Sequence, residues 1–149
     1  MLSVHTSRFG TIDVDEDKMI RFPEGLLGFP HQKEFVLLDH KPGSPFRWLQ
    51  AVDKPELAFI MTNPFLFKQD YLDGLSSEEE AHIVGGQGEE IAVFALVTIP
   101  SGQAEKATIN LLGPLVIDLK SRNGRQVILA NAGYTHRHPL FPQPHSNGR

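Results

Sequence analysis

The stretch Ala107–Ala130 reads ATINLLGPLVIDLKSRNGRQVILA and carries the strongest hairpin signal in the chain. Two apolar runs, Leu115–Leu119 and Val127–Ala130, flank a segment that ends in Asn123-Gly124. Asn-Gly favours a type I′ turn because both residues tolerate a positive φ. We therefore predict a tight hairpin with Gly124 at positive φ. Gly113-Pro114 separates a preceding run, since proline cannot donate to a central ladder, so we expect three short strands in an antiparallel meander.

Short apolar or alternating runs, separated by Gly, Pro, Asn and Asp, recur through the rest of the chain. We predict further strands at 4–8, 11–14, 18–22, 35–38, 46–52, 57–62 and 91–99. Ser76 or Ser77, followed three residues later by Glu79 or Glu80, resembles a capping box and predicts one short helix around residues 76–83. This pattern is typical of an all-β fold, mainly antiparallel, and predicts a small β-barrel-like or sandwich domain.

The length of 149 residues indicates one domain, which we place at residues 1–140. Residues 141–149 are polar and contain two prolines, so we expect a flexible C-terminal tail there. The chain has no cysteine, which excludes disulfides and thiolate metal sites and is compatible with a reducing cytosol. Met1–His5 lacks the basic region of a signal peptide, and the apolar run Ile91–Ile99 is too short to span a bilayer as a helix.

The net charge of -4 bears on the class of partner. An acidic chain does not attract a phosphate backbone, so we expect no direct binding of nucleic acid. A basic protein is the electrostatically easier partner.

Three sequence patterns resemble a metal site, a phosphate-binding loop and a calcium-binding loop, but each lacks residues that such a site requires. His136 and His138 could share a metal if they lie on one strand face, but no third ligand is near and Arg137 would repel a cation. The Gly-rich segment 85–88 lacks the lysine of a phosphate-binding loop and is followed by two glutamates. The alternating aspartates at 13–17 lack the glycine and terminal glutamate of a calcium loop. We therefore expect no catalytic residue, no metal and no cofactor.

A cluster of bulky apolar residues follows the predicted strand 57–62. We predict a partner-binding surface formed by Asn63, Pro64, Phe65, Leu66 and Phe67. In a strand-like segment Phe65 and Phe67 share one face and Leu66 takes the other, so burying all three is difficult. One interpretation is that they plug a barrel end, but the apolar loop 26–29 already offers a plug. The other is that they anchor a protein partner.

Two other classes of function are compatible with parts of the sequence. An OB-like domain binds single-stranded nucleic acid by stacking bases on aromatic residues over a basic groove. The aromatic candidates are Phe46, Trp48, Phe65 and Phe67. The basic residues among them are only Arg47 and Lys68, and core packing explains Trp48 better. A hydrolase that uses His136 or His138 is the other alternative.

An ordered set of motifs extends from about Ser7 to Leu140. The motifs are FPEGLLGF at 22–29, FRWLQ at 46–50, LAF at 57–59, NPF at 63–65, NLLGPLVI at 110–117, RQVIL at 125–129 and YTHRHPL at 134–140. In this order they resemble the FliW family of bacterial flagellar assembly factors. The chain departs from the family pattern at Gly113, where alanine is expected, at Asp118, where asparagine is usual, and in the looser segment 85–88.

The resemblance implies a small cytoplasmic β-barrel-like protein without catalytic activity. Members of this family bind flagellin, and they also bind the translational repressor CsrA and keep it from silencing the flagellin message. Flagellin and CsrA compete, so secretion of flagellin frees the factor to capture CsrA. Two modes of inhibition stay open, one at a site away from the RNA surface of CsrA and one by direct blocking. The resemblance implies no direct contact with nucleic acid and no membrane.

Overall fold

A ring of seven strands forms the centre of the molecule. The computed structural model describes residues 1–39, 41–84 and 90–141. The ring contains β3 (Met19–Arg21), β4 (Glu34–Asp39), β5 (Phe46–Ala51), β6 (Ala58–Thr62), β7 (Ile91–Thr98), β9 (Leu115–Asp118) and β10 (Asn123–Gln126). It closes because β7 pairs with both β6 and β9. All neighbours are antiparallel except β3 and β10, which are parallel. The all-β, barrel-like prediction is confirmed.

Alternate residues of these strands fill the barrel. Leu49 of β5 and Ile117 of β9, for example, belong to one fully buried cluster, whereas their neighbours in sequence face outward. The loop between β3 and β4 adds Leu26 to this cluster and sets Phe29 edge-to-face on Phe59 at 5.3 Å between ring centroids. The apolar loop 26–29 therefore plugs the barrel as expected, except that Leu27 is 72% exposed.

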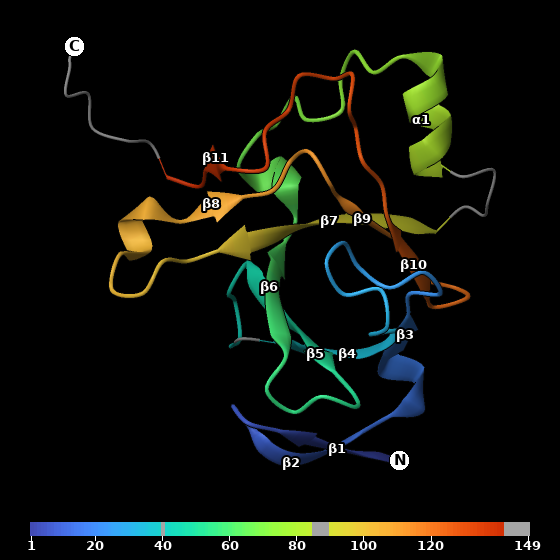
Figure 1. The fold of residues 1–149 in the computed structure, drawn as a ribbon, viewed down its shortest axis with the longest axis vertical. Coiled ribbons are helices and arrows are strands. Elements are labelled where there is room, and N and C mark those ends of the chain that lie inside the picture. The colour runs from blue at the N-terminus through green and yellow to red at the C-terminus, as the bar shows by residue number, and fades with distance from the viewer. Residues whose placement is uncertain (40, 85–89, 142–149) are drawn as a thin grey trace.

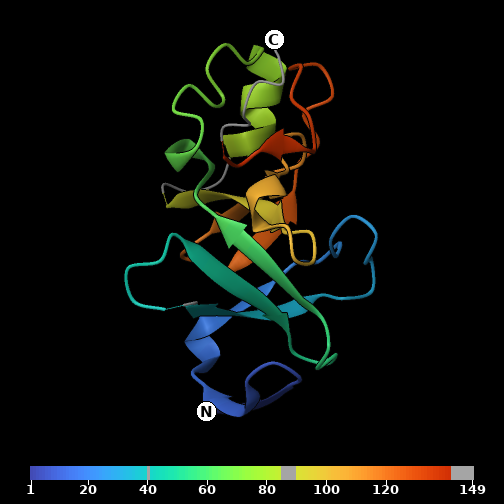
Figure 2. The ribbon, with the colours of Figure 1, turned by 90° about the vertical axis from the view of Figure 1, so that its left-hand side faces the viewer.

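Two layers cover opposite sides of the barrel, at the two ends of the long axis in Figure 1 and Figure 2. We call the hairpin of β1 (Leu2–Thr6) and β2 (Gly10–Val14) the small cover; it packs on the outward residue Val36. A 3₁₀ helix, Glu16–Lys18, links it to β3. We call residues 64–84, 104–111 and 127–141 the large cover. Its regular elements are α1 (Ser77–Val84), β8 (Thr108–Ile109), β11 (His138–Pro139) and the 3₁₀ helices Pro64–Leu66 and Ala104–Lys106.

The predicted short helix is α1. The Ser76 hydroxyl accepts a hydrogen bond from the Glu79 main-chain N–H at 3.1 Å, as an N-cap does. The Glu79 carboxylate does not complete a capping box; it accepts from the Asn131 N–H at 3.2 Å and ties the helix to a distant loop. No helix in the described part of the chain is long and apolar enough to cross a membrane. The Gly-rich segment 85–88 and the predicted tail, apart from Phe141, lie outside the described residues.

The predicted hairpin exists as β9 and β10, but its turn differs from the prediction. Asp118 pairs with Asn123, so the turn covers residues 119–122 and the positive φ of 66° falls on Arg122. Gly124 is a strand residue opposite Ile117. Glycine is required at this position because a Cβ would lie 2.7 Å from the Phe22 ring, and not because of a positive φ.

The predicted meander is wrong. The strand β8 pairs with β7 and β11 rather than with β9, which instead closes the barrel on β7. The run Val127–Ala130 forms no strand, although the main-chain N–H groups of Val127 and Leu129 donate to Pro114 and Leu112. Local alternation indicates that segments are extended, but it does not select the partner of each strand.

Candidate protein-binding surface

The segment 63–67, which we call the aromatic segment, begins where β6 ends. The Asn63 side chain accepts a hydrogen bond from the Phe65 N–H at 2.9 Å, and Pro64 occupies the first position of the 3₁₀ helix. Asparagine and proline are favoured at these two positions of a helix start. The aromatic segment is therefore a tight helical turn, and the strand-like alternation expected from the sequence is wrong.

The helical turn separates the apolar side chains of the segment. Pro64 is buried, Leu66 is 60% exposed and Phe65 is 37% exposed, with its ring against Tyr71 at 5.7 Å. Phe67 stacks on Phe46 of β5 at 6.1 Å with 22° between the planes. Leu66 and one face of Phe65 thus reach solvent, whereas Phe67 packs against the buried cluster between the large cover and the barrel. The structure brings the five predicted residues together on the large cover, away from the barrel end that the loop 26–29 fills.

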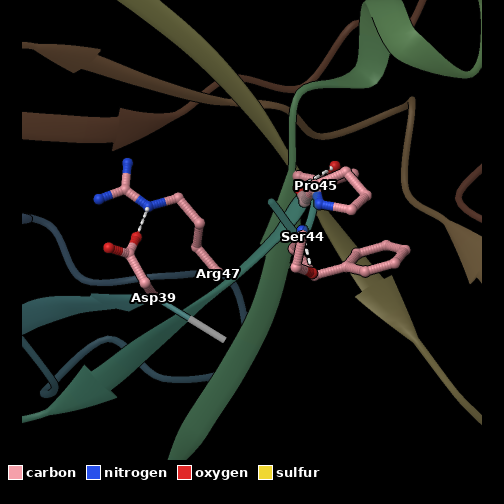
Figure 3. A network of polar contacts seen from close by, with 6 residues as sticks. Asp39, Ser44, Pro45 and Arg47 are labelled. Atoms are coloured by element: carbon pink, nitrogen blue, oxygen red, sulfur yellow. Dashed lines mark hydrogen bonds and ion pairs between the residues drawn. The ribbon is translucent and has the colours of Figure 1, made fainter. Parts of the chain in front are cut away.

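Polar contacts flank the aromatic segment on both sides. The Thr62 hydroxyl donates to the Pro45 carbonyl at 2.7 Å, next to the Ser44-Pro45 turn in Figure 3. On the other side an ion pair joins Lys68 to Asp70 at 2.9 Å. The hydrogen bond in this pair raises the pKa of Lys68 and lowers the pKa of Asp70, so both groups stay charged at neutral pH.

Tyr71 supports the segment from beneath. Its ring is buried against Tyr134 at 4.8 Å, and its hydroxyl donates to the Leu111 carbonyl at 2.6 Å. Burial raises the pKa of the Tyr71 phenol far above its ordinary value, so the phenol stays neutral and keeps this hydrogen bond. The apolar side chains of the aromatic segment therefore rest on a rigid base.

A groove of about 340 Å³ lies between the two covers; we call it the Trp48 groove. Its lining residues are Arg8, Phe46, Arg47, Trp48, Ile60 and Ile99. Trp48 faces outward from β5, between Leu38 and Ile60 on the neighbouring strands. Figure 2 shows β5 and β6 crossing the front of the molecule between the covers. Because Phe46 both lines this groove and stacks on Phe67, the groove and the aromatic segment form one apolar band.

Sequence reasoning missed the Trp48 groove, because it assigned Trp48 to the core. Gln50 of FRWLQA is buried as well, but the available signal was the alternation of the apolar residues Leu49 and Ala51, which are both fully buried. Trp48 has the opposite parity and therefore faces out of the barrel. It is only partly buried, packed edge-to-face on Phe9 at 5.9 Å.

A second hollow, of about 360 Å³, lies beside the exposed side chain of Leu27. Ile128, which is 45% exposed, lines it together with Arg125 and Gln126. The Leu27 N–H donates to the Gln126 side-chain oxygen at 2.8 Å and fixes this loop to the strand β10. This hollow was also missed, because Leu27 was grouped with the buried residues of its loop.

The two histidines of the pair, His136 and His138, lie in different environments. His138 lies in β11 opposite Ile109, where burial and the nearby Lys68 lower its pKa. His136 is exposed in the preceding loop. Across residues 1–39, 41–84 and 90–141, no group of three or more His, Asp or Glu side chains is placed to hold a metal ion.

Comparison with known proteins identifies the family. The model of the FliW protein family matches residues 3–140. A flagellar assembly factor FliW of Magnetococcus marinus is 40% identical over 141 residues, covering 95% of this chain and 86% of that protein. One of Natranaerobius thermophilus is 40% identical over 140 residues, covering 94% and 93%. The crystal structure of a flagellar assembly factor FliW superimposes with a TM-score of 0.80 at 34% identity and covers 95% of this chain and 98% of that one. The chain therefore belongs to the FliW family of flagellar assembly factors.

Proposed function

We propose that this protein binds flagellin in the cytoplasm and also binds the translational repressor CsrA, and that it thereby relieves repression of flagellin translation. The observation that carries the proposal is the family match over residues 3–140. In this proposal flagellin and CsrA compete for the protein, so export of flagellin releases it to capture CsrA. The role requires binding only, and the relatives are named as assembly factors, so we propose no enzymatic activity.

The net charge of -4 supports the second partner. An RNA-binding repressor presents basic surface to phosphates, and a negatively charged protein attracts the same surface over long range. The negative charge also disfavours direct binding of the message. An OB-fold closes five strands, whereas this barrel closes seven, which removes the structural reason for the nucleic-acid alternative.

We place part of the partner surface on the aromatic segment, Asn63, Pro64, Phe65, Leu66 and Phe67. Leu66 projects into solvent from a helical turn whose main chain is fixed by the Asn63 cap and the buried Pro64. An exposed apolar side chain on a rigid base loses little conformational entropy when a partner covers it. A few side chains that become fully desolvated contribute most of the binding energy in many protein interfaces.

The test uses isothermal titration calorimetry of the purified protein with flagellin and, separately, with CsrA. Wild type should bind both, and Leu66→Ser should weaken at least one complex by about tenfold or more. Ile128→Ser is the matched control, because Ile128 is similarly exposed but lies on a different surface. A Leu66→Ser variant that binds both partners like wild type would remove the aromatic segment from the interface.

The regulatory part of the proposal is tested with a complex of CsrA and flagellin-message RNA. Added protein should release the RNA, and added flagellin should reverse the release. The protein alone should not retard the RNA at moderate salt. A CsrA–RNA complex that survives saturating protein would contradict the proposed regulation.

A further inference from the structure

The Trp48 groove differs in charge from the rest of this acidic protein. The chain has 18 acidic and 14 basic residues, yet the charged residues that line the groove are both arginines. Arg8 comes from the loop of the small cover and holds its guanidinium 4.3 Å from the centre of the Trp48 ring. None of the ion pairs found among the described residues involves Arg8.

The second arginine of the groove is already engaged. Arg47 donates through Nε to the Asp39 carboxylate at 3.2 Å, and Figure 3 shows this pair beside β5. Of the two arginines, Arg8 is therefore the one that forms no ion pair with another described residue. Its position over the indole ring limits its motion before binding, which reduces the entropy cost of forming an ion pair.

The rest of the groove is apolar. Phe46, Trp48 and Ile60 line it, and Ile99, 43% exposed, lies just beyond the end of β7. A bulky apolar side chain that enters here removes apolar surface from water on both partners. A carboxylate beside that side chain would meet Arg8 in a partly desolvated place, where ion pairs are stronger than on an open surface.

We propose that the Trp48 groove binds flagellin, through a segment that places a large apolar side chain next to a carboxylate. The assignment rests on the proposed function for the identity of the two partners, and charge selects between them. Arg8 repels a basic RNA-binding repressor and attracts an acidic segment. CsrA then makes its contacts outside the groove.

The apolar band explains how partners with different contacts can still compete. Phe46 lines the groove and its ring stacks on Phe67, so the groove continues directly into the aromatic segment. Flagellin seated in the groove therefore lies next to Phe67 and restricts access to the aromatic segment. A repressor that needs the aromatic segment is then excluded although it makes no contact with Arg8.

The test compares the full-length protein with two groove variants by isothermal titration calorimetry against flagellin and CsrA. The variants are Arg8→Glu and Ile99→Asp, which change exposed side chains that two different segments contribute to the groove. The matched controls are Arg21→Glu, at an exposed arginine of β3, and Leu27→Asp, at the exposed leucine of the other hollow. Circular dichroism melting curves identify any variant that has lost its fold.

Both groove variants should bind flagellin about tenfold or more weakly than wild type, because one reverses the required charge and the other places a charge in the apolar part. Neither variant should bind CsrA more weakly than wild type does. The two controls should bind flagellin normally, and Arg8→Glu should also abolish most of the salt dependence of flagellin binding.

Two results would overturn the assignment while the proposed function stands. In one, wild type binds flagellin and both folded groove variants bind it equally well. In the other, Arg8→Glu weakens CsrA as much as flagellin, which contradicts the separation of partners by charge. A wild type that binds no flagellin would instead refute the proposed function, and this assignment with it.

Discussion

The two covers of the barrel are stabilised in different ways. The small cover packs a few aliphatic side chains, with Val4, Val14 and Val36 fully or nearly buried. In the large cover, polar side chains bond to distant main-chain groups, as Tyr71 does to Leu111 and Tyr134 to the Leu72 N–H at 2.8 Å. Buried polar bonds of this kind specify one arrangement, and the buried cluster under the small cover is much smaller than that under the large cover. We infer that the large cover unfolds with the barrel and that the small cover opens separately.

The largest effect is expected from truncating the base of the large cover. Tyr71→Ala should destabilise the protein by about 3–5 kcal/mol, because it leaves a cavity under the aromatic segment. Tyr71→Phe keeps the ring and removes the hydrogen bond to Leu111, so about 1–2 kcal/mol should be lost. Urea unfolding curves measure both. Equal losses in the two variants would mean that the ring packing contributes little.

The second-largest effect is expected from a substitution in the barrel that supports both covers. Gly124→Ala should cost about 1–3 kcal/mol, because the new Cβ would overlap the buried Phe22 ring. The control is Gly10→Ala in the small cover, where φ is +70° and nothing lies within 4 Å of the new Cβ. Left-handed strain alone should cost about 1 kcal/mol there. The same urea titration compares them, and a harmless Gly124→Ala would show that Phe22 can move aside.

A smaller and local effect is expected in the small cover. Val4→Ala removes two buried methyl groups and should lower the stability of the hairpin by about 1.5 kcal/mol. Native-state hydrogen exchange should show faster exchange in β1 and β2 and unchanged exchange in β9 and β10. If β9 and β10 lose protection equally, the two covers unfold together and the comparison fails.

The smallest effect is a pH dependence within the large cover. Burial and Lys68 lower the pKa of His138 below its ordinary value of 6.5, so the unfolded chain binds a proton more readily than the folded one. The contribution of His138 to stability is therefore complete above pH 6.5 and is lost as the pH falls through its folded pKa. His138→Gln should remove this slope from melting temperatures measured between about pH 8 and 5. An unchanged slope would assign the dependence to other groups.

Strand positions were predictable from the sequence, and strand partners largely were not. The segment at 91–99 is predicted as a buried strand and forms β7, since a long apolar run between turn signals has few other solutions, but only Ala95 and Val97 of this strand are buried. The partners of β7 are β6, β8 and β9. These pairings depend on contacts between segments far apart in the sequence, which no local pattern encodes. Gly124 illustrates the same limit. Glycine is required at this position because the Phe22 ring, distant in sequence, leaves no space for a Cβ, and not because of a turn.

The sequence indicates the position of the aromatic segment but not its conformation. Asn63-Pro64 correctly marked the end of a strand, and three bulky residues after it indicated exposed apolar surface. Which of them is exposed depends on the Asn63 cap and on the stacking of Phe67 on Phe46, a residue from another strand. Alternation in FRWLQA indicates that Trp48 faces outward, but the groove itself could not be predicted, because Arg8, Trp48 and Ile99 come from three separate segments.

The parallel pair that completes the ring has a consequence for how the protein folds. Arg21 of β3 meets Asn123 of β10, residues roughly one hundred positions apart. Chains dominated by such distant pairings fold slowly, in about milliseconds to seconds. A ribosome needs roughly 5–20 s to add one hundred residues, so β3 emerges long before its partner. Until then the nascent sheet has an open edge, to which another chain could add by strand pairing. The edge of β3 therefore needs protection while the chain is being synthesised. In the finished barrel β10 covers this edge, and the need is gone.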